Sequence, residues 1–154
     1  MGESVSRLGL PVESDRRIRQ LAIYWDGLRP DGSLPGRQHF DPTNFPSFLA
    51  NIWLIDVQRE PMRFRFRLVG TRVAEFLGRD PTGLWIDEAY PSFPGSAIED
   101  DFVACASAGE PRWRRGPPFM EAGKDYAQVE RIALPLATNG HDTDMILCLS
   151  LYEK

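Results

Sequence analysis

The stretch that decides the fold is Arg63-Phe-Arg-Phe-Arg-Leu-Val69, followed directly by Gly70-Thr-Arg-Val-Ala-Glu-Phe-Leu-Gly78. In the first part, arginine alternates with phenylalanine and leucine, which is the period-two pattern of a strand with one buried and one solvated face. A strand of this kind is typical of an antiparallel sheet. The second part has helical spacing over Thr71–Leu77, and Gly78 is suited to end that helix.

Further elements are predicted on both sides of this stretch. The apolar run Ile52–Val57 contains β-branched residues and is followed by the turn residues Glu60-Pro61, so we interpret it as the preceding strand. After the stretch, Gly95–Ala108 predicts a helix. Three strands are then predicted at 111–119, 126–137 and 144–152. This order indicates an α+β domain of the sensor type, with a pocket between sheet and helices.

The N-terminal part predicts one more helix. Ser14 or Asp15 can cap a helix from Arg16 to about Leu28, which divides the chain into a flexible tail (1–13), a flanking helix (14–30) and the sensor domain (31–154). The helix is amphipathic, with one apolar stripe made of Ile18, Leu21, Ala22, Trp25 and Leu28. Something must cover this stripe. Two interpretations stay open: packing on the chain's own sheet, and a dimer interface with a second copy.

Composition and charge exclude several classes of protein. A length of 154 residues with 42% hydrophobic residues suffices for one domain with a buried core. No apolar run approaches the roughly 18 residues of a membrane span, and the first residues lack a secretory signal pattern. A net charge of −4 argues against a broad nucleic-acid surface. Cys105 and Cys148 lie in apolar stretches as expected of buried free thiols, so we expect a cytoplasmic setting.

Several short motifs resemble those of a known family. They are Tyr24–Arg29, Leu34–Arg37, Phe40–Pro42, Phe64–Thr71 and Gly78–Gly83. Through them, residues 16–153 resemble a PAS domain, and the chain is most similar to short single-domain bacterial PAS proteins of unknown function. The resemblance implies a five-stranded antiparallel sheet with helices over one face and a pocket between them. It also implies that the N-terminal helix mediates pairing, as it often does in that family.

The cofactors of that family do not match the residues of this chain. Haem-binding members need an axial ligand, commonly histidine, whereas His39 and His141 fall in predicted loops. Photoactive flavin members carry a reactive cysteine on the helix after the second strand, and Thr71–Gly78 has none. The apolar helical setting of Cys105 would raise the pKa of its thiol, which does not suit a chromophore anchor. We interpret His141–Asp144 as a turn rather than a metal site, so we expect neither cofactor nor metal.

Inward positions of the predicted elements supply the candidate pocket residues, each of which could equally be ordinary core: Phe64, Phe66, Leu68, Phe76, Trp85, Ile98, Phe102, Trp113, Ile132 and Leu147. Alternation along the strand Arg112-Trp113-Arg114-Arg115 predicts Trp113 inward, with Arg112 and Arg114 in solvent. Arg115 would then share the inward side, as the one basic residue expected to meet an anionic ligand.

Three hypotheses about function follow. The first is a stand-alone PAS-like sensory or regulatory domain without enzymatic activity, which binds a small molecule or a protein partner and signals through homodimerisation or a separate effector. The second is a small pocket enzyme of the isomerase or dehydratase type with Asp56 as acid or base, near Tyr90 or Tyr126. The third is a ligand-free adaptor, whose pocket would be filled by side chains. We expect no nucleic-acid or membrane partner.

Overall fold

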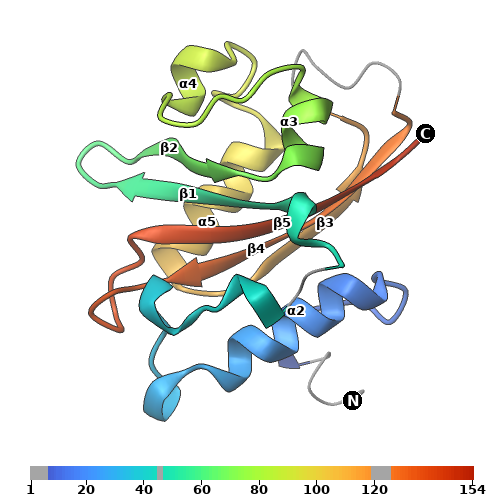
Figure 1. The fold of residues 1–154 in the computed structure, drawn as a ribbon. Helices are drawn as coiled ribbons and strands as arrows, with labels where there is room; N and C mark the ends of the chain where they lie inside the picture. Colours follow the sequence, from blue (N-terminus) through green and yellow to red (C-terminus); the bar gives the residue numbers. More distant parts are fainter. Residues whose placement is uncertain (1–6, 45–46, 119–125) are drawn as a thin grey trace.

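A five-stranded antiparallel sheet forms the centre of the protein (Figure 1). The structure is a computed structural model that describes residues 7–44, 47–118 and 126–154. The strands are β1 (Ile52–Gln58), β2 (Arg63–Val69), β3 (Arg112–Gly116), β4 (Gln128–Leu136) and β5 (Met145–Glu153). They are ordered β2-β1-β5-β4-β3, with every neighbouring pair antiparallel. The predicted sheet is confirmed, although residue 119, where the third strand was expected to end, lies outside the described residues.

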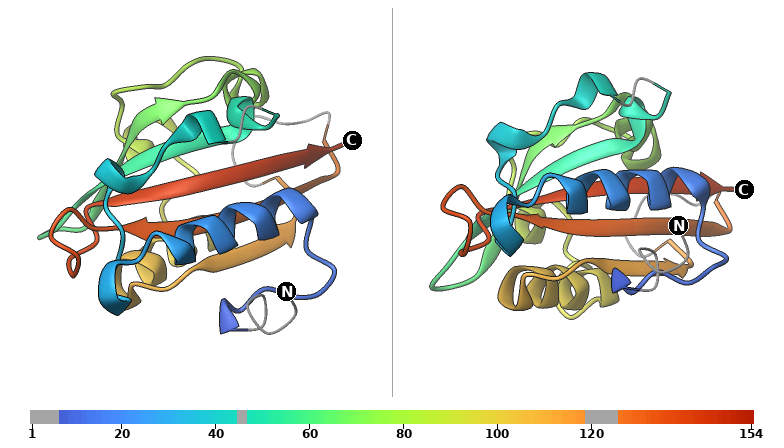
Figure 2. Two further views of the ribbon diagram at one scale, coloured as in Figure 1. Left: turned by 60° about the horizontal axis from the view of Figure 1, so that its bottom comes forward. Right: turned by 90° about the horizontal axis from the view of Figure 1, so that it is seen from below.

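Helices cover both faces of the sheet. α3 (Thr71–Leu77), α4 (Ile86–Ala89) and α5 (Ala97–Ala108) pack on one face, hereafter the inner face. α2 (Arg16–Gly27) packs on the opposite, outer face, and Figure 2 shows α2 and α5 on the two sides of the sheet. α3 has the predicted bounds, and Gly78 ends it in the left-handed backbone conformation at a φ of 83°.

Each face of the sheet has its own hydrophobic core, because alternate residues of a strand point to opposite sides. On β4, Ile132 and Leu134 belong to the outer core under α2, while Val129 and Ala133 belong to the inner core under α5. All four side chains are buried. The central strands therefore have no solvated face, and their apolar pattern does not tell which side of the sheet a residue faces.

The apolar stripe holds α2 to the outer face. Asp15 caps the helix as predicted, because its carboxylate accepts a hydrogen bond from the Arg17 backbone N–H at 2.8 Å. The indole N–H of Trp25 donates to the carbonyl of Pro135 on β4, also at 2.8 Å. Four stripe residues are at most 1% exposed and the fifth is partly buried: Ile18, Leu21, Ala22 and Trp25, then Leu28. The chain's own sheet covers the predicted dimer interface, so these four side chains are not available to a second copy.

The segment before α2 also contributes to the outer core. Leu8 and Leu10 are 6% and 5% exposed and lie in the same cluster as Trp25. Arg7 forms an ion pair with Asp26 of α2. From residue 7 onward, the predicted flexible tail is therefore packed on the domain, because burying two leucines favours a fixed position. Residues 1–6 of that tail lie outside the described residues.

A β-bulge in β2 changes the face of Leu68. β1 pairs Ile55 with Phe66 but pairs Leu54 with Leu68, so Arg67 is the extra residue. Phe66 stays in the inner core, whereas Leu68 lies on the outer side and is 44% exposed. The alternation predicted both inward. It is wrong for Leu68, because one inserted residue exchanges the two faces of a strand.

Short 3-10 turns connect α2 to β1: Pro30–Gly32, Arg37–His39, Pro42–Asn44 and Leu49–Asn51. Residues 45–46, between the third and the fourth of these turns, lie outside the described residues. Over the ranges that the structure describes, no helix is both long and apolar enough to span a membrane.

Candidate functional site

Side chains fill the space between the sheet and its inner helices. The ring centres of Phe64 and Phe102 are 5.5 Å apart, and those of Trp53 and Phe102 are 5.8 Å apart, which are distances of direct packing. A cavity beside α3, lined in part by Phe76 and Tyr152, has a volume of about 10 Å³. That volume is about what a single water molecule needs. The predicted pocket is closed here, as the adaptor hypothesis requires.

Five of the predicted pocket residues belong to this inner core: Phe64, Phe66, Phe76, Ile98 and Phe102. All five are at most 6% exposed, and they come from β2, α3 and α5. The sequence therefore placed the aromatic part of the inner core correctly. Phe64, Phe66 and Phe102 pack in the interior, whereas Phe76 and Ile98 also line cavities of the inner face.

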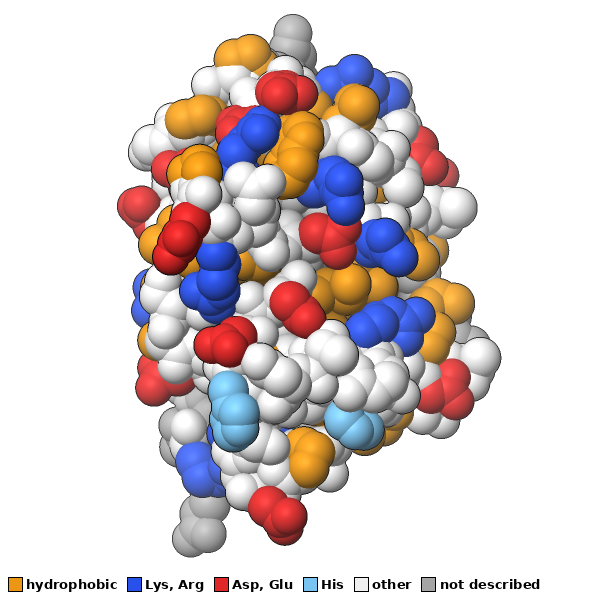
Figure 3. Space-filling view, turned by 90° about the vertical axis from the view of Figure 1, so that its left-hand side faces the viewer, with side chains coloured by type: hydrophobic (Ala, Val, Ile, Leu, Met, Phe, Trp, Pro, Cys, Tyr) orange, Lys and Arg blue, Asp and Glu red, His pale blue; other side chains and the backbone are white. Residues whose placement is uncertain are grey.

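The two histidines lie on the surface and the two cysteines lie in the interior. His39 and His141 are exposed, and both histidines of the chain are visible on the surface in Figure 3. His39 Nδ1 accepts a hydrogen bond from the backbone N–H of Gly36 at 2.9 Å. Burial raises the pKa of the Cys105 thiol, as predicted, and that of Cys148. Among residues 7–44, 47–118 and 126–154, no group of three or more His, Cys, Asp or Glu is placed to hold a metal ion.

The other six predicted pocket residues lie outside the inner core: Leu68, Trp85, Trp113, Arg115, Ile132 and Leu147. Ile132 and Leu147 are part of the outer core, and Trp113 packs against it. The prediction is wrong for these three because both faces are covered. The alternation correctly predicts that these three side chains lie on the same face of the sheet. It does not indicate which of the two buried faces that is.

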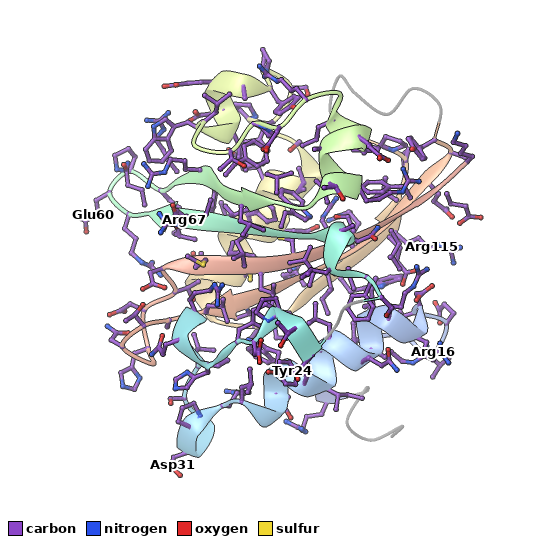
Figure 4. The ribbon with its side chains drawn as sticks, in the orientation of Figure 1. Arg16, Tyr24, Asp31, Glu60, Arg67 and Arg115 are labelled. Carbon is purple, nitrogen blue, oxygen red and sulfur yellow. The ribbon has the colours of Figure 1, made fainter. Side chains whose placement is uncertain are left out.

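Arg115 and Trp85 lie at the margins of the sheet. Arg115 is exposed, donates to the Gln128 side chain at 3.0 Å, and lies at the same end of the molecule as Arg16 (Figure 4). It is not part of the inner core, and its predicted contact with a pocket ligand stays a prediction. Trp85 bridges the free edge of β2, with the guanidinium groups of Arg63 and Arg65 4.3 and 5.3 Å from its ring centre.

Arg112 and Arg114 are exposed, as predicted, and their guanidinium groups bind Asp101 of α5. Asp101 of α5 is 4% exposed and accepts two hydrogen bonds from Arg114, at 2.6 and 3.0 Å, and a longer one from Arg112 at 3.4 Å. A buried carboxylate requires such partners, since an uncompensated charge in the interior is costly. This ion-pair cluster joins α5 to the edge strand β3.

Arg131 is the functional candidate that the sequence analysis missed. It lies on β4 between Val129 and Ala133, which face inward, and its residue exposure is 5%. Burial lowers the pKa of its guanidinium. A signal was present in the sequence, because Arg131 interrupts the apolar run of β4 at an inward position. Buried arginines are rare, and charged groups with perturbed pKa values gather at functional sites.

Polar side chains surround Arg131 on the inner face. Ser150 of β5 is paired directly across from it and is 1% exposed. The Ser150 hydroxyl accepts a hydrogen bond from the Trp53 indole N–H at 2.9 Å and is also hydrogen-bonded to Tyr152. Burial raises the pKa of the Tyr152 phenol. Arg131, Ser150 and Tyr152 thus bring polar groups together within the otherwise apolar inner core.

A second and larger cavity reaches Arg131 from the side. This Arg131 cavity is lined by Ala97, Ile98, Arg114, Pro117, Val129 and Arg131, among others, and has a volume of about 230 Å³. It lies where α5 begins and β3 ends. α5 and β3 run antiparallel. The turn at Gly109 that connects them therefore lies at the end of this helix–strand pair that is farther from the cavity. The arrangement can hold a small molecule beside a buried positive charge.

Asp56 does not have the position that the enzyme hypothesis requires. It pairs with Arg65 and Met145 across the neighbouring strands, and its carboxylate binds the Arg65 guanidinium at 3.1 Å. Met145 packs on the outer core, so Asp56 lies on the outer face. Tyr90 and Tyr126 belong to the inner cluster. The predicted approach of Asp56 to either tyrosine is wrong, because the sheet separates them.

An apolar groove remains open on the outer face beside α2. This outer groove is lined by Phe40, Leu49, Ile52, Leu54 and Leu68, among others, and has a volume of about 600 Å³. Leu49 and Leu68 are 40% and 44% exposed. The groove exists because α2 contacts β4, while β1 and β2 lie beyond it.

The strand order, the inner helices and the added N-terminal helix define an α+β domain of the sensor type. A family model described as PAS domain matches residues 13–150. The chain therefore belongs to the PAS domain family, and the match includes α2 as well as the sheet. This membership gives the chain a sensory or regulatory role in general terms. A search of curated proteins found no match to the chain.

Proposed function

We propose that this PAS domain is a regulatory module that binds a small molecule in the Arg131 cavity and catalyses no reaction. One observation supports this choice of site: Arg131, a residue that is 5% exposed, is among those that line a cavity of about 230 Å³. The inner core offers only about 10 Å³ beside α3. Charged residues with perturbed pKa values that lie beside a cavity are candidates for a functional site.

α5 connects the proposed ligand site to the rest of the molecule. Its first residues line the Arg131 cavity, and Asp101 one turn later binds β3 through Arg114. If α5 can adopt two positions, a ligand that binds one of them more tightly shifts the equilibrium toward that position. The size of the shift is set by the difference between its affinities for the two positions. The changed surface would then be recognised by a separate effector protein or by a second copy of the chain.

Native mass spectrometry of the freshly purified chain tests this proposal, with the same sample measured again under denaturing conditions. An excess mass that is lost on denaturation supports a retained ligand. If the chain is bare, a thermal-shift screen of small anions, cations and neutral compounds follows. A bare chain whose unfolding temperature responds to none of them would refute small-molecule sensing.

A second candidate function is self-association through the outer groove, which would make the chain a homodimeric adaptor. The half-exposed leucines 49 and 68 favour it, because a groove of apolar side chains is stabilised when it is covered. Sedimentation of the wild-type chain and of Leu68→Glu tests it. We expect a dimer that the variant converts to a folded monomer. A wild-type monomer at all concentrations, or a dimer unaffected by Leu68→Glu, contradicts this use of the groove.

A further inference from the structure

The two edges of the sheet differ in what covers them. At the β2 edge, the segment after α3 adds a short bridge, because Phe66 donates its backbone N–H to the Leu84 carbonyl at 3.0 Å and accepts from the Gly83 N–H at 2.7 Å. At the other edge, β3 pairs along its whole length with β4 and is the outermost strand (Figure 2). Among the described residues, no backbone hydrogen bond is formed on the other side of β3.

A free strand edge is an interaction surface in its own right. Every second residue of such a strand directs its N–H and C=O away from the sheet, and an extended peptide can bind these groups as an additional strand. β3 has five residues, which lies within the usual strand length of about 3–10. α5 contacts β3 from the inner side, so it does not extend the sheet beyond β3.

Open space adjoins both ends of β3. A cleft of about 690 Å³ beside its start is lined by the first two residues of the strand and by residues 7–9 of the segment before α2, among others. The Arg131 cavity adjoins its other end, where Arg114–Gly116 contribute to the lining. Each residue of β3 therefore borders a hollow of the surface, and a neighbouring chain has room beside the strand.

β3 is basic, although the net charge of the chain is −4. Three of its five residues are arginine, and their side chains are 39–46% exposed. Arg114 donates two hydrogen bonds to Asp101 of α5, at 2.6 and 3.0 Å, so its charge is compensated within the protein.

The other two arginines of β3 have weaker partners. Arg112 reaches the Asp101 carboxylate at 3.4 Å, and Arg115 donates to Gln128 at 3.0 Å and to Glu153 at 3.4 Å. A guanidinium carries several N–H groups, so both side chains retain donors for a further acceptor. Arg112 lies on the inner side with α5, and Arg115, three residues later, lies on the outer side.

The charge of β3 selects its partner. A second copy that pairs β3 with β3 would set arginine opposite arginine, and like charges in that position destabilise a sheet. We propose that the free edge of β3 binds an extended acidic segment of another protein as an additional antiparallel strand. Two acidic side chains three positions apart would lie opposite Arg112 and Arg115. A β-branched side chain suits the position opposite Trp113, which is partly buried.

Titration of the isotopically labelled chain with end-capped hexapeptides, followed by NMR, tests the partner, because amide shifts detect weak binding and locate it. The probe is Thr-Glu-Thr-Val-Glu-Thr, which has the proposed spacing. Its isomer Thr-Glu-Val-Glu-Thr-Thr has the same composition, but both glutamates share one face. We expect the probe to shift the amides of β3 and to bind about two- to fivefold more tightly than the isomer. A version with glutamine in place of glutamate should bind more weakly still.

Methylated versions of the probe test whether its backbone pairs with β3. Only every second N–H of an added strand faces its neighbour. Methylation of those nitrogens removes the donors and should weaken binding by about tenfold. Methylation of the alternate nitrogens, which point into solvent, should leave the affinity nearly unchanged. Equal affinity of the two versions would show that the peptide does not extend the sheet.

Two variants of the chain test the charges. Arg112→Gln and Arg115→Gln should each weaken binding of the probe by about two- to fivefold. The matched control is Arg67→Gln, which removes the same charge from an exposed arginine on β2, at the opposite edge of the sheet. It should bind the probe as the wild type does. An equal loss in all three variants would mean that only the total charge of the chain matters.

Three further outcomes would overturn the inference. The first is equal affinity for the glutamate and glutamine peptides, and the second is the absence of shifts in β3 at millimolar probe. The third is a wild-type dimer whose β3 amides lose their protection from exchange on dilution, since a second copy would then cover the edge. This inference goes beyond the proposed function and needs no ligand in the Arg131 cavity. Its failure therefore leaves the small-molecule proposal standing.

Discussion

Gly70 lies where the chain leaves β2 and begins α3, and the backbone packs too closely there for a side chain. A Cβ atom would overlap the carbonyl oxygen of Ala50 and lie 2.7 Å from that of Ile52, which accepts the Gly70 N–H at 2.8 Å. Its φ of −64° suits any residue, so the requirement is one of space. We expect Gly70→Ala to lower the free energy of unfolding by about 1–3 kcal/mol or more, measured by urea unfolding.

Gly27→Ala is the matched control for this substitution. Gly27 is the last residue of α2 and has nothing within 4 Å of its Cβ position. Because alanine favours helix more than glycine does, Gly27→Ala should leave stability unchanged or raise it by up to about 1 kcal/mol. Similar losses in the two variants would show that Gly70 is not sterically restricted.

Trp25 tests whether α2 serves the chain's own sheet. Trp25→Phe removes the indole donor and leaves the Pro135 carbonyl without this hydrogen bond. We expect the free energy of unfolding to fall by about 1–3 kcal/mol, with no change in the molecular mass in solution. Trp25→Asp would instead bury a charge and unfold the chain, so it is unsuitable as a probe of dimerisation. Unchanged stability with a changed mass would mean that the stripe contacts a second copy.

At the level of single residues, the sequence predicted membership of the core better than it predicted the site. Phe64 and Phe102 were placed in the inner core correctly, because large aromatic residues at regular spacing are nearly always buried. Arg115 was chosen as the ligand-facing base, and Arg131, which was not chosen, lines the same cavity. The choice between them depends on which face of the sheet each strand position meets, and a short-range pattern does not contain that information.

The N-terminal cap of α2 can be tested at the level of the element. The Asp15 carboxylate accepts hydrogen bonds from the Arg17 backbone N–H at 2.8 Å and from its guanidinium at 3.0 Å. We expect Asp15→Ala to lower the unfolding free energy by about 1 kcal/mol, and Asp15→Asn to keep most of it because asparagine is also a good cap. Thermal unfolding of the three chains measures this. An alanine variant as stable as the wild type would mean that the cap contributes nothing.

The Asp15 cap also has a defined pH dependence. The Arg17 side chain holds the pKa of Asp15 below its usual range. A lowered pKa in the folded state means that the stabilisation is present above the ordinary aspartate pKa of about 3.9 and is lost as pH falls through the folded value. The difference in stability between the wild type and Asp15→Asn should therefore shrink below about pH 4.

Elements were predicted well where their signals are local. α3 has the predicted bounds because its end is set by Gly78, and β4 and β5 each lie within two residues of their predicted limits. The direction of Leu68 was wrong because the bulge at Arg67 depends on pairing with β1. The sequence left open what α2 packs against. An apolar stripe shows that one face of a helix is buried, but it does not identify the surface that buries it.

For the whole molecule, the buried neutral acids predict a loss of stability in alkali. Burial raises the pKa of Cys105, Cys148 and Tyr152 above their ordinary values. In the unfolded chain these groups release protons from about pH 8.5 for the thiols and about pH 10 for the phenol. The contribution of these groups to the free energy of unfolding is therefore fully present below those pH values and is lost as pH rises through them. The loss is about 2 kcal/mol for each thiol at pH 10.

The composition of the chain makes this alkaline loss easy to assign. Of its 18 Lys and Arg residues, only Lys124 and Lys154 are lysine, so nearly all ion pairs keep their charge up to about pH 12. Urea midpoints at pH 7, 9 and 10 measure the loss, with Cys148→Ala as the comparison. That variant starts less stable because it loses packing, but its midpoint should decline less with pH, since one titrating thiol is gone. A parallel decline in both chains would place the titrating groups elsewhere, and a flat wild-type profile would mean that the thiols ionise inside the folded protein.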